Sequence, residues 1–196
     1  MGAPATTHHA LLISGSLRKA SANTAILRTT IDVAGAAVAG AVIGCHLYGR
    51  LGLLPAFNPD ADRDPLDPEV ERLRASIHAA DGIIFSTPEY AGALPGSLKN
   101  LLDWTIGDEE PGSIYNKPVG WINTSARGAA GAYGELQAVL GYAHASIVEA
   151  ACVALPITET MIGTDGLIED ATVRRVLAEV LAELRAARTV TPEDGA

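Results

Sequence analysis

The chain is poor in cysteine, in aromatic residues and in positive charge. Only 5% of its 196 residues are aromatic, and its two cysteines, Cys45 and Cys152, lie in apolar runs without the spacing of a metal site. We interpret both as buried thiols, and so sparse a use of cysteine favours a reducing cytoplasm. The chain has 14 basic and 23 acidic residues, and its net charge of −9 argues against nucleic acid as a partner.

Long apolar runs are also absent, although 48% of the residues are hydrophobic. No run reaches the roughly 18 apolar residues of a membrane span, so none is expected. Residues 1–9 are polar and lack the apolar stretch of a secretion signal. We therefore predict a cytoplasmic protein with disordered tails at residues 1–9 and 189–196, and a single domain over residues 10–188.

Two familiar phosphate-binding motifs, G-x-x-x-x-G-K-[ST] and G-x-G-x-x-G, are missing. In their place, an apolar run at 10–14 breaks at Gly15 into a loop rich in hydroxyls, and Ser21 is a good N-cap for the helix that follows. The free N–H groups of a helix start attract anions, and Arg18 adds a charged donor. Further side-chain donors are Ser16, Ser21, Asn23 and Thr24. The loop is either a phosphate site or a connection whose hydroxyls only cap the helix.

Short apolar runs alternate with segments of helical period along the whole chain. Strands are expected at 10–14, 41–47, 82–87, 118–123 and 146–155. Five helices are expected. Three of them span about 22–38, 96–106 and about 170–188. Another begins after an N-cap at Asp67, and another follows the loop 124–134 and ends at about residue 144. This order predicts an α/β fold with a five-stranded parallel sheet covered by helices on both faces. Ligands of such sheets bind at the carboxyl ends of the strands.

Three loops that leave the first, third and fourth strands have unusual compositions. The loop after the third strand holds two prolines and two glycines, which fix a backbone path that could border a planar heterocycle, with Tyr90 as an aromatic wall. The alternative is that these prolines and glycines only shape a turn. The loop 124–134 is rich in glycine, and the irregular stretch 48–67 is either functional or a solvated surface.

Here the sequence resembles a known family. Gly-Ser-Leu-Arg at 15–18, with Ser21 and Asn23, is followed about 70 residues later by Pro-Glu-Tyr-x-x-x-x-Pro-Gly-x-Leu-Lys-Asn-x-x-Asp-Trp at 88–104. Both motifs are similar to those of the NADPH-dependent FMN reductase family, and the similarity covers about residues 10–185. The resemblance implies a flavodoxin-like three-layer α/β/α fold and an FMN-dependent enzyme related to quinone, chromate and azo-dye reductases.

The resemblance also implies which residues hold the cofactor. The FMN phosphate would lie in the loop after the first strand, on Gly15, Ser16, Arg18, Ser21, Asn23 and Thr24. The isoalloxazine ring would be bordered by Pro88, Glu89, Tyr90, Ala91 and Gly92, and on its other side by Ser125, Arg127 and Gly128. One residue departs from the family pattern, because many relatives have Asn where this chain has Ala91.

FMN would carry the reaction, so no catalytic protein residue and no metal is expected. The expected reaction is ping-pong hydride transfer from NAD(P)H to FMN and then to a quinone or another small acceptor, and the arginines mildly favour NADPH over NADH. By resemblance, a homodimer or homotetramer is expected. A non-enzymatic FMN electron carrier of the flavodoxin type is the alternative, which the acidic composition would suit. A third possibility is a regulatory module that binds phosphate but no flavin.

Overall fold

The five strands form one parallel sheet. The structure, a computed structural model, describes residues 8–36 and 42–188. The strand order is β2-β1-β3-β4-β5, and every neighbouring pair is parallel. The strands are β1 (His8–Ser14), β2 (Ile43–Tyr48), β3 (Gly82–Ser86), β4 (Pro118–Asn123) and β5 (Ser146–Ala154). Because the order reverses between β1 and β3, the sheet has its switch point at their carboxyl ends.

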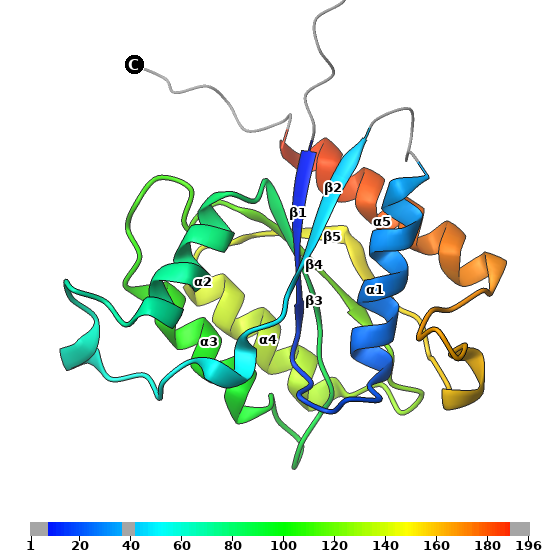
Figure 1. Cartoon of the computed structure of the whole chain (residues 1–196), viewed down its shortest axis with the longest axis horizontal. Coiled ribbons are helices and arrows are strands. Elements are labelled where there is room, and N and C mark those ends of the chain that lie inside the picture. Colours follow the sequence, from blue (N-terminus) through cyan, green and yellow to red (C-terminus); the bar gives the residue numbers. More distant parts are fainter. Residues whose placement is uncertain (1–7, 37–41, 189–196) are drawn as a thin grey trace, which may run out of the picture.

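Helices cover both faces of this sheet. They are α1 (Ala22–Gly35), α2 (Pro68–His78), α3 (Gly96–Ile106), α4 (Ala130–Tyr142) and α5 (Ala171–Arg188). Three short 3₁₀ helices are η1 (Leu51–Leu53), η2 (Pro59–Ala61) and η3 (Glu159–Met161). Figure 1 shows α1 and α5 on one face and α2, α3 and α4 on the other. The predicted three-layer α/β/α fold is confirmed.

The hydrophobic core has one layer on each side of the sheet. Along β1, Leu11 and Ile13 pack under α2, α3 and α4, whereas Leu12 packs under α1 and α5. Strand β3 is buried at every residue, as its nearly continuous apolar run predicts for a central parallel strand. The two layers hold the strand ends in fixed positions, and the loops that leave those ends are placed accordingly.

Several element boundaries agree with the prediction. Helix α3 and strand β4 have the predicted bounds. Asp67 caps α2 as predicted, since its Oδ1 accepts a hydrogen bond of 2.8 Å from Glu69 N. The irregular stretch 48–67 contains η1 and η2.

Other boundaries differ from the prediction. Strand β1 begins at His8 rather than Ala10, because it pairs with β2 from that residue on, so His8 and His9 belong to the sheet. Helix α4 begins at Ala130, inside the predicted loop 124–134. Helix α1 ends at Gly35, and β2 runs from Ile43 to Tyr48. The predictions for residues 1–7, 37–41 and 189–196 fall outside the described residues.

The two cysteines are less buried than predicted. Cys45 and Cys152 are both partly exposed free thiols. Desolvation still raises the pKa of Cys45 to about 12 and that of Cys152 to about 11, so both stay protonated at neutral pH. Within residues 8–36 and 42–188, no group of three His, Cys, Asp or Glu side chains is placed to hold a metal ion. No helix in the same residues is long and apolar enough to cross a membrane.

Candidate functional site

Three loops come together at the carboxyl edge of the sheet. Loop 1 (residues 15–21) follows β1, loop 2 (residues 87–95) follows β3, and loop 3 (residues 124–129) follows β4. Since β1, β3 and β4 are neighbours in the sheet, the three loops are neighbours as well. They lie at the lower end of the sheet in Figure 1. The structure therefore brings together the three loops that the sequence singled out.

Asn23 joins these loops through its side chain. Its Oδ1 accepts hydrogen bonds from Ser86 Oγ (2.9 Å) and Thr124 Oγ1 (3.0 Å). Ser86 is the last residue of β3, and its carbonyl accepts a bond of 2.8 Å from Gly15 N. Asn23 is only 7% exposed. A buried amide with two hydroxyl partners fixes the first turn of α1 against the ends of β3 and β4.

Loop 1 has the geometry of an anion site. Ser21 caps α1 as predicted, with Oγ accepting from Thr24 N at 3.4 Å. The N–H groups of Ala22 and Asn23, at the start of the same helix, have no acceptor in the part of the chain that the structure describes. The hydroxyls of Ser16, Ser21 and Thr24 lie in the same segment. Free N–H groups, hydroxyls and the helix dipole together favour a bound anion.

Arg18 is held by its own loop. Its Nε and Nη2 donate to Ala20 O at 3.1 and 2.7 Å, and its guanidinium lies 3.7 Å from the exposed carboxylate of Glu159. A guanidinium has five N–H donors, so donors remain for a further anion. Arg18 is 64% exposed, and the exposure makes its contact with Glu159 weak.

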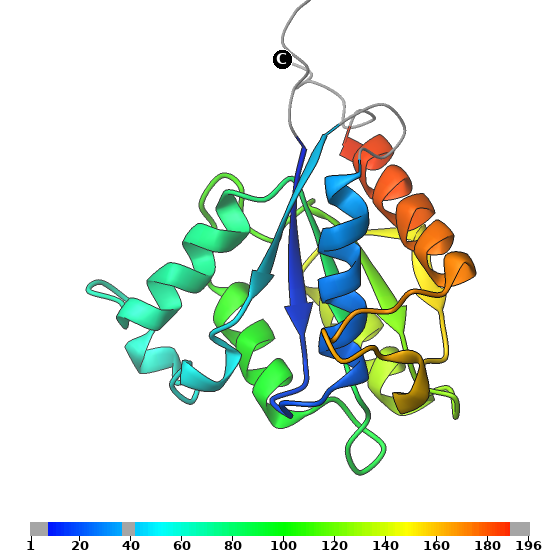
Figure 2. The ribbon, with the colours of Figure 1, turned by 45° about the vertical axis from the view of Figure 1, so that its right-hand side comes forward.

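A cavity of about 430 Å³ lies beside loop 1. Its charged lining residues are Arg18, Lys19, Arg28 and Glu159. One wall comes from the segment 159–166 after β5, which Figure 2 shows beside the start of α1. This wall was not predicted, because nothing in the sequence of a loop after the last strand indicates that it folds back to the first helix.

Loop 2 ends in a tight hairpin. Tyr90 and Ala93 exchange two backbone hydrogen bonds of 3.0 Å, and the two residues between them have positive φ, 51° at Ala91 and 78° at Gly92. Two positive φ values in a two-residue turn are typical of type I′, which favours Asn-Gly. The side chain of Tyr90 is 52% exposed at the tip of this hairpin. It is thus available as the predicted aromatic wall.

Glu89 binds the start of α4. Its Oε2 accepts hydrogen bonds from Gly131 N (2.8 Å) and Ala132 N (3.1 Å). A carboxylate at this position satisfies two unpaired N–H groups and the positive end of the helix dipole. The contact explains why α4 begins so early, although the residue at its N-cap, Ala129, offers no side-chain cap. Glu89 therefore has a structural partner across loops 2 and 3.

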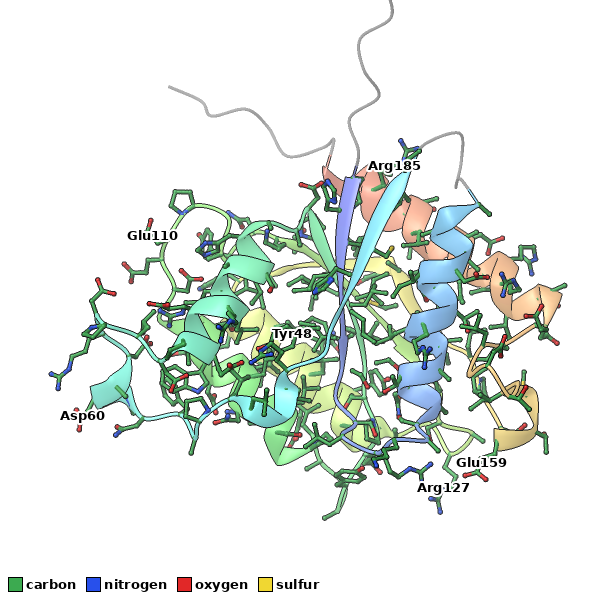
Figure 3. The ribbon with its side chains drawn as sticks, viewed as in Figure 1. Tyr48, Asp60, Glu110, Arg127, Glu159 and Arg185 are labelled. Carbon is green, nitrogen blue, oxygen red and sulfur yellow. The ribbon has the colours of Figure 1, made fainter. Side chains whose placement is uncertain are left out.

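Loop 3 is fixed by its own backbone and by Asn123. Asn123 Nδ2 donates to Gly128 O at 2.5 Å, and Asn123 Oδ1 accepts from Ser125 N at 2.9 Å. Ser125 Oγ accepts from Arg127 N at 3.2 Å. Gly128 has a φ of 88°, which turns the chain into α4. Figure 3 shows the exposed Arg127 at the same edge of the molecule as Glu159.

Two side chains that organise this edge were missed in the sequence. Tyr133 Oη donates to Ile122 O (2.9 Å) and accepts from Thr87 N (3.2 Å), while Glu135 Oε2 accepts from Leu94 N at 2.7 Å. Burial raises the pKa of Tyr133 to about 12, so its hydroxyl stays protonated. Both residues lie on α4, whose period indicates a helix but does not reveal which loop its polar groups contact.

The fold and its three loops define a flavodoxin-like α/β protein with a candidate ligand site at the switch point of the sheet. Comparison with known proteins gives the family. A sequence profile described as "NADPH-dependent FMN reductase" matches residues 9–160. The chain belongs to this family, and the resemblance recognised in its motifs is confirmed.

Two curated relatives and one solved structure illustrate the likeness. The chain is 37% identical over 114 residues to "Probable NADPH:quinone oxidoreductase 2" of Oryza sativa subsp. japonica, covering 58% of this chain and 54% of that protein. It is 34% identical over 119 residues to a quinone reductase of Escherichia coli K12, covering 60% and 59%. The chain thus spans little more than half the length of these relatives. FerB of Paracoccus denitrificans, a flavoenzyme NAD(P)H:(acceptor) oxidoreductase, superposes with a TM-score of 0.73 at 26% identity, covering 93% of this chain and 98% of FerB.

Proposed function

We propose that residues 10–188 act as one FMN-binding domain and that the FMN phosphate binds loop 1. The observation that carries this proposal is the start of α1, where two free N–H groups, three hydroxyls and the guanidinium of Arg18 lie together. Gly15 fits this role because a Cβ there would lie 2.2 Å from Thr87 Oγ1, so only glycine allows loop 1 this close to loop 2. Asn23 would act by holding the three loops together as well as through its backbone N–H.

The flavin ring would lie between loops 2 and 3. Their rigid backbones would meet its polar edge, and the exposed ring of Tyr90 would cover part of it. The residues proposed for this contact are Pro88, Glu89, Tyr90, Ala91, Gly92, Ser125, Arg127 and Gly128. Because the carboxylate of Glu89 is engaged at α4, we propose that Glu89 shapes the site and transfers no proton.

The proposed activity is the reduction of a quinone or another small acceptor by NAD(P)H. Bound FMN would supply the hydride chemistry, first oxidising the nicotinamide and then reducing the acceptor in ping-pong order. The protein would bind and orient, and no protein nucleophile or base is required. Arginines at this edge, Arg18 and Arg127, would suit the extra phosphate of NADPH. We further propose a cytoplasmic homodimer or homotetramer in which a second subunit covers the open side of the flavin.

The visible spectrum of the purified protein, before and after anaerobic addition of NADPH, tests this proposal. We expect flavin absorption near 450 nm, a value common to oxidised flavins, that bleaches with NADPH and returns with a quinone. A yellow protein that neither NADPH nor NADH bleaches would be an electron carrier instead. A colourless protein that takes up no added FMN would refute the FMN site.

A further inference from the structure

A larger cleft lies away from the three loops, between the edge strand β2 and helix α2. Its volume is about 560 Å³, which is in the range of small-molecule sites. Within residues 8–36 and 42–188, it shares no lining residue with the cavity beside loop 1. Its lining includes Leu11, Tyr48, Arg50, Arg72, Ala75 and Ala79.

Small residues on both walls open this cleft. Ala75 on α2 and Ala79, the C-cap of the same helix, are four positions apart, and their short side chains line the cleft. On β2, Gly44 has no side chain, and the ring of His9, another lining residue, packs over it: a Cβ at Gly44 would lie 2.8 Å from His9 Nδ1. The cleft therefore follows from the sequence of its walls.

Tyr48 lines the cleft and has a buried, unsatisfied hydroxyl. The residue ends β2 and is only 4% exposed, yet its hydroxyl has no hydrogen-bond partner among the described residues. Figure 3 shows Tyr48 between β2 and α2. Burial raises the pKa of Tyr48 to about 12, so the hydroxyl is a neutral donor. A buried donor without an acceptor is costly, and a ligand that accepts its proton would remove the cost.

The charge of the lining is opposite to that of the whole protein. The net charge of the chain is −9, but among the described residues no Asp or Glu lines the cleft, whereas Arg50 and Arg72 do. Both arginines bind Glu69 just outside the lining: Arg50 through Nε and Nη2, each at 2.5 Å, and Arg72 through Nη1 at 2.8 Å. The three side chains keep one net positive charge, and each guanidinium retains free N–H donors.

We propose that this cleft binds a small apolar carboxylate, such as an aromatic acid. The carboxylate accepts hydrogen bonds from the Tyr48 hydroxyl and from the free N–H groups of Arg50. The ring lies on the apolar wall of Leu11, Ala75 and Ala79. An anion satisfies the buried donor and the excess positive charge together, whereas a cation or a neutral hydrocarbon satisfies neither. The site is separate from the proposed FMN site and does not depend on it.

Calorimetric titration of the full-length protein with 2-naphthoate tests the proposal, with uncharged 2-naphthamide as the matched ligand. Both titrations are made with and without added FMN, so that binding at the three loops is told apart from binding in the cleft. We expect naphthoate to bind under both conditions and the amide to bind at least about tenfold more weakly. Absence of naphthoate binding, or equal binding of the two ligands, would overturn the proposal.

Two variants locate the bound acid. Tyr48→Phe removes one donor to a charged group and should weaken naphthoate binding about tenfold. Ala75→Phe fills the cleft and should abolish binding. Tyr142→Phe, which alters a tyrosine that is 75% exposed elsewhere, is the control and should bind normally. Thermal unfolding of each variant checks its fold. Folded variants of Tyr48 and Ala75 that bind naphthoate as the wild type does would place the acid elsewhere. Loss of naphthoate binding as the protein concentration rises would show that a second copy of the chain covers the cleft. Either result would refute the proposal.

Discussion

Tyr48 and Tyr133 are both buried, and both have a pKa raised to about 12, but their surroundings differ. At the carboxyl edge, the Tyr133 hydroxyl donates to Ile122 O and accepts from Thr87 N. Beside the β2–α2 cleft, the buried Tyr48 hydroxyl has no partner among the described residues. The Tyr133 hydroxyl is satisfied in its hydrogen bonds, and the Tyr48 hydroxyl is not.

This difference separates two ways of building a site. At the carboxyl edge, Asn23, Glu89 and Tyr133 join the loops so that the free donors of loop 1 are presented on a rigid support. Rigid support keeps the geometry that a cofactor needs. In the cleft, the unsatisfied hydroxyl itself marks the place where a ligand would be bound. Substitutions that break these contacts at the carboxyl edge should therefore cost stability, and Tyr48→Phe should not.

The largest effect is expected from Gly131→Ala. A Cβ at Gly131 would lie 1.9 Å from Gly92 O, so the loop 2 hairpin would have to move off the start of α4. We expect a loss of about 3 kcal/mol in the free energy of unfolding, together with a loss of FMN binding. Urea unfolding and flavin titration measure the two effects.

Gly134→Ala is the matched control in the same helix. A Cβ there meets nothing within 4 Å, so the substitution should add about 0.5–1 kcal/mol through helix propensity. If both variants behaved alike, the close approach of loop 2 to α4 would not matter, and the carboxyl edge would not be the rigid region described above.

Tyr133→Phe and Tyr48→Phe test the comparison directly. The first leaves the buried Thr87 N–H without its acceptor, whereas Ile122 O keeps its hydrogen bond from Ser86 Oγ (2.8 Å), and it should cost about 2 kcal/mol. The second removes a hydroxyl without a partner and should leave stability unchanged or raise it by about 1 kcal/mol. Both free energies come from urea unfolding without ligand. Equal losses would mean that the Tyr48 hydroxyl is satisfied in solution.

The fold could be read from the sequence because its signals are local. The apolar run of β3, the N-caps Ser21 and Asp67, and the Pro-Gly pair at the start of α3 each act within a few residues. The alternation of strands and helices then fixes the parallel sheet, and its carboxyl edge fixes where the three loops meet.

The contacts between the loops could not be read in the same way. The oxygen of Asn23 meets Thr124, which is 101 positions away, and Glu89 meets Gly131 at a separation of 42. Such pairs depend on how helices settle on the sheet, and no local pattern encodes them. The same holds for the cleft, whose walls come from β1, β2 and α2.

Glu89→Gln asks whether the carboxylate only supports the edge. Gln keeps an acceptor for Gly131 N but removes the charge at the start of α4, so we expect a loss of about 0.5–1 kcal/mol that shrinks in concentrated salt. Quinone reduction at saturating FMN should persist. Glu109→Gln removes an equal charge from an exposed loop and should leave stability unchanged. Abolished turnover in a folded, flavin-loaded Glu89→Gln protein would instead make Glu89 a proton donor.

The smallest effect is expected at Ala91, the strained position of the otherwise well-satisfied loop 2. Its φ of 51° is unfavourable for alanine but tolerated by asparagine, the residue that the resemblance to the family implies at this place. Ala91→Asn should therefore raise the free energy of unfolding by about 0.5 kcal/mol. Ala126→Asn, at an exposed loop position without positive φ, is the control and should give no gain.

Because the hairpin tip borders the proposed flavin ring, the flavin reduction potential of the Ala91→Asn protein is measured alongside its urea midpoint. A gain in stability with an unchanged potential would show that the alanine affects only the turn. A destabilised variant would mean that the turn already suits alanine and that loop 2 carries no strain.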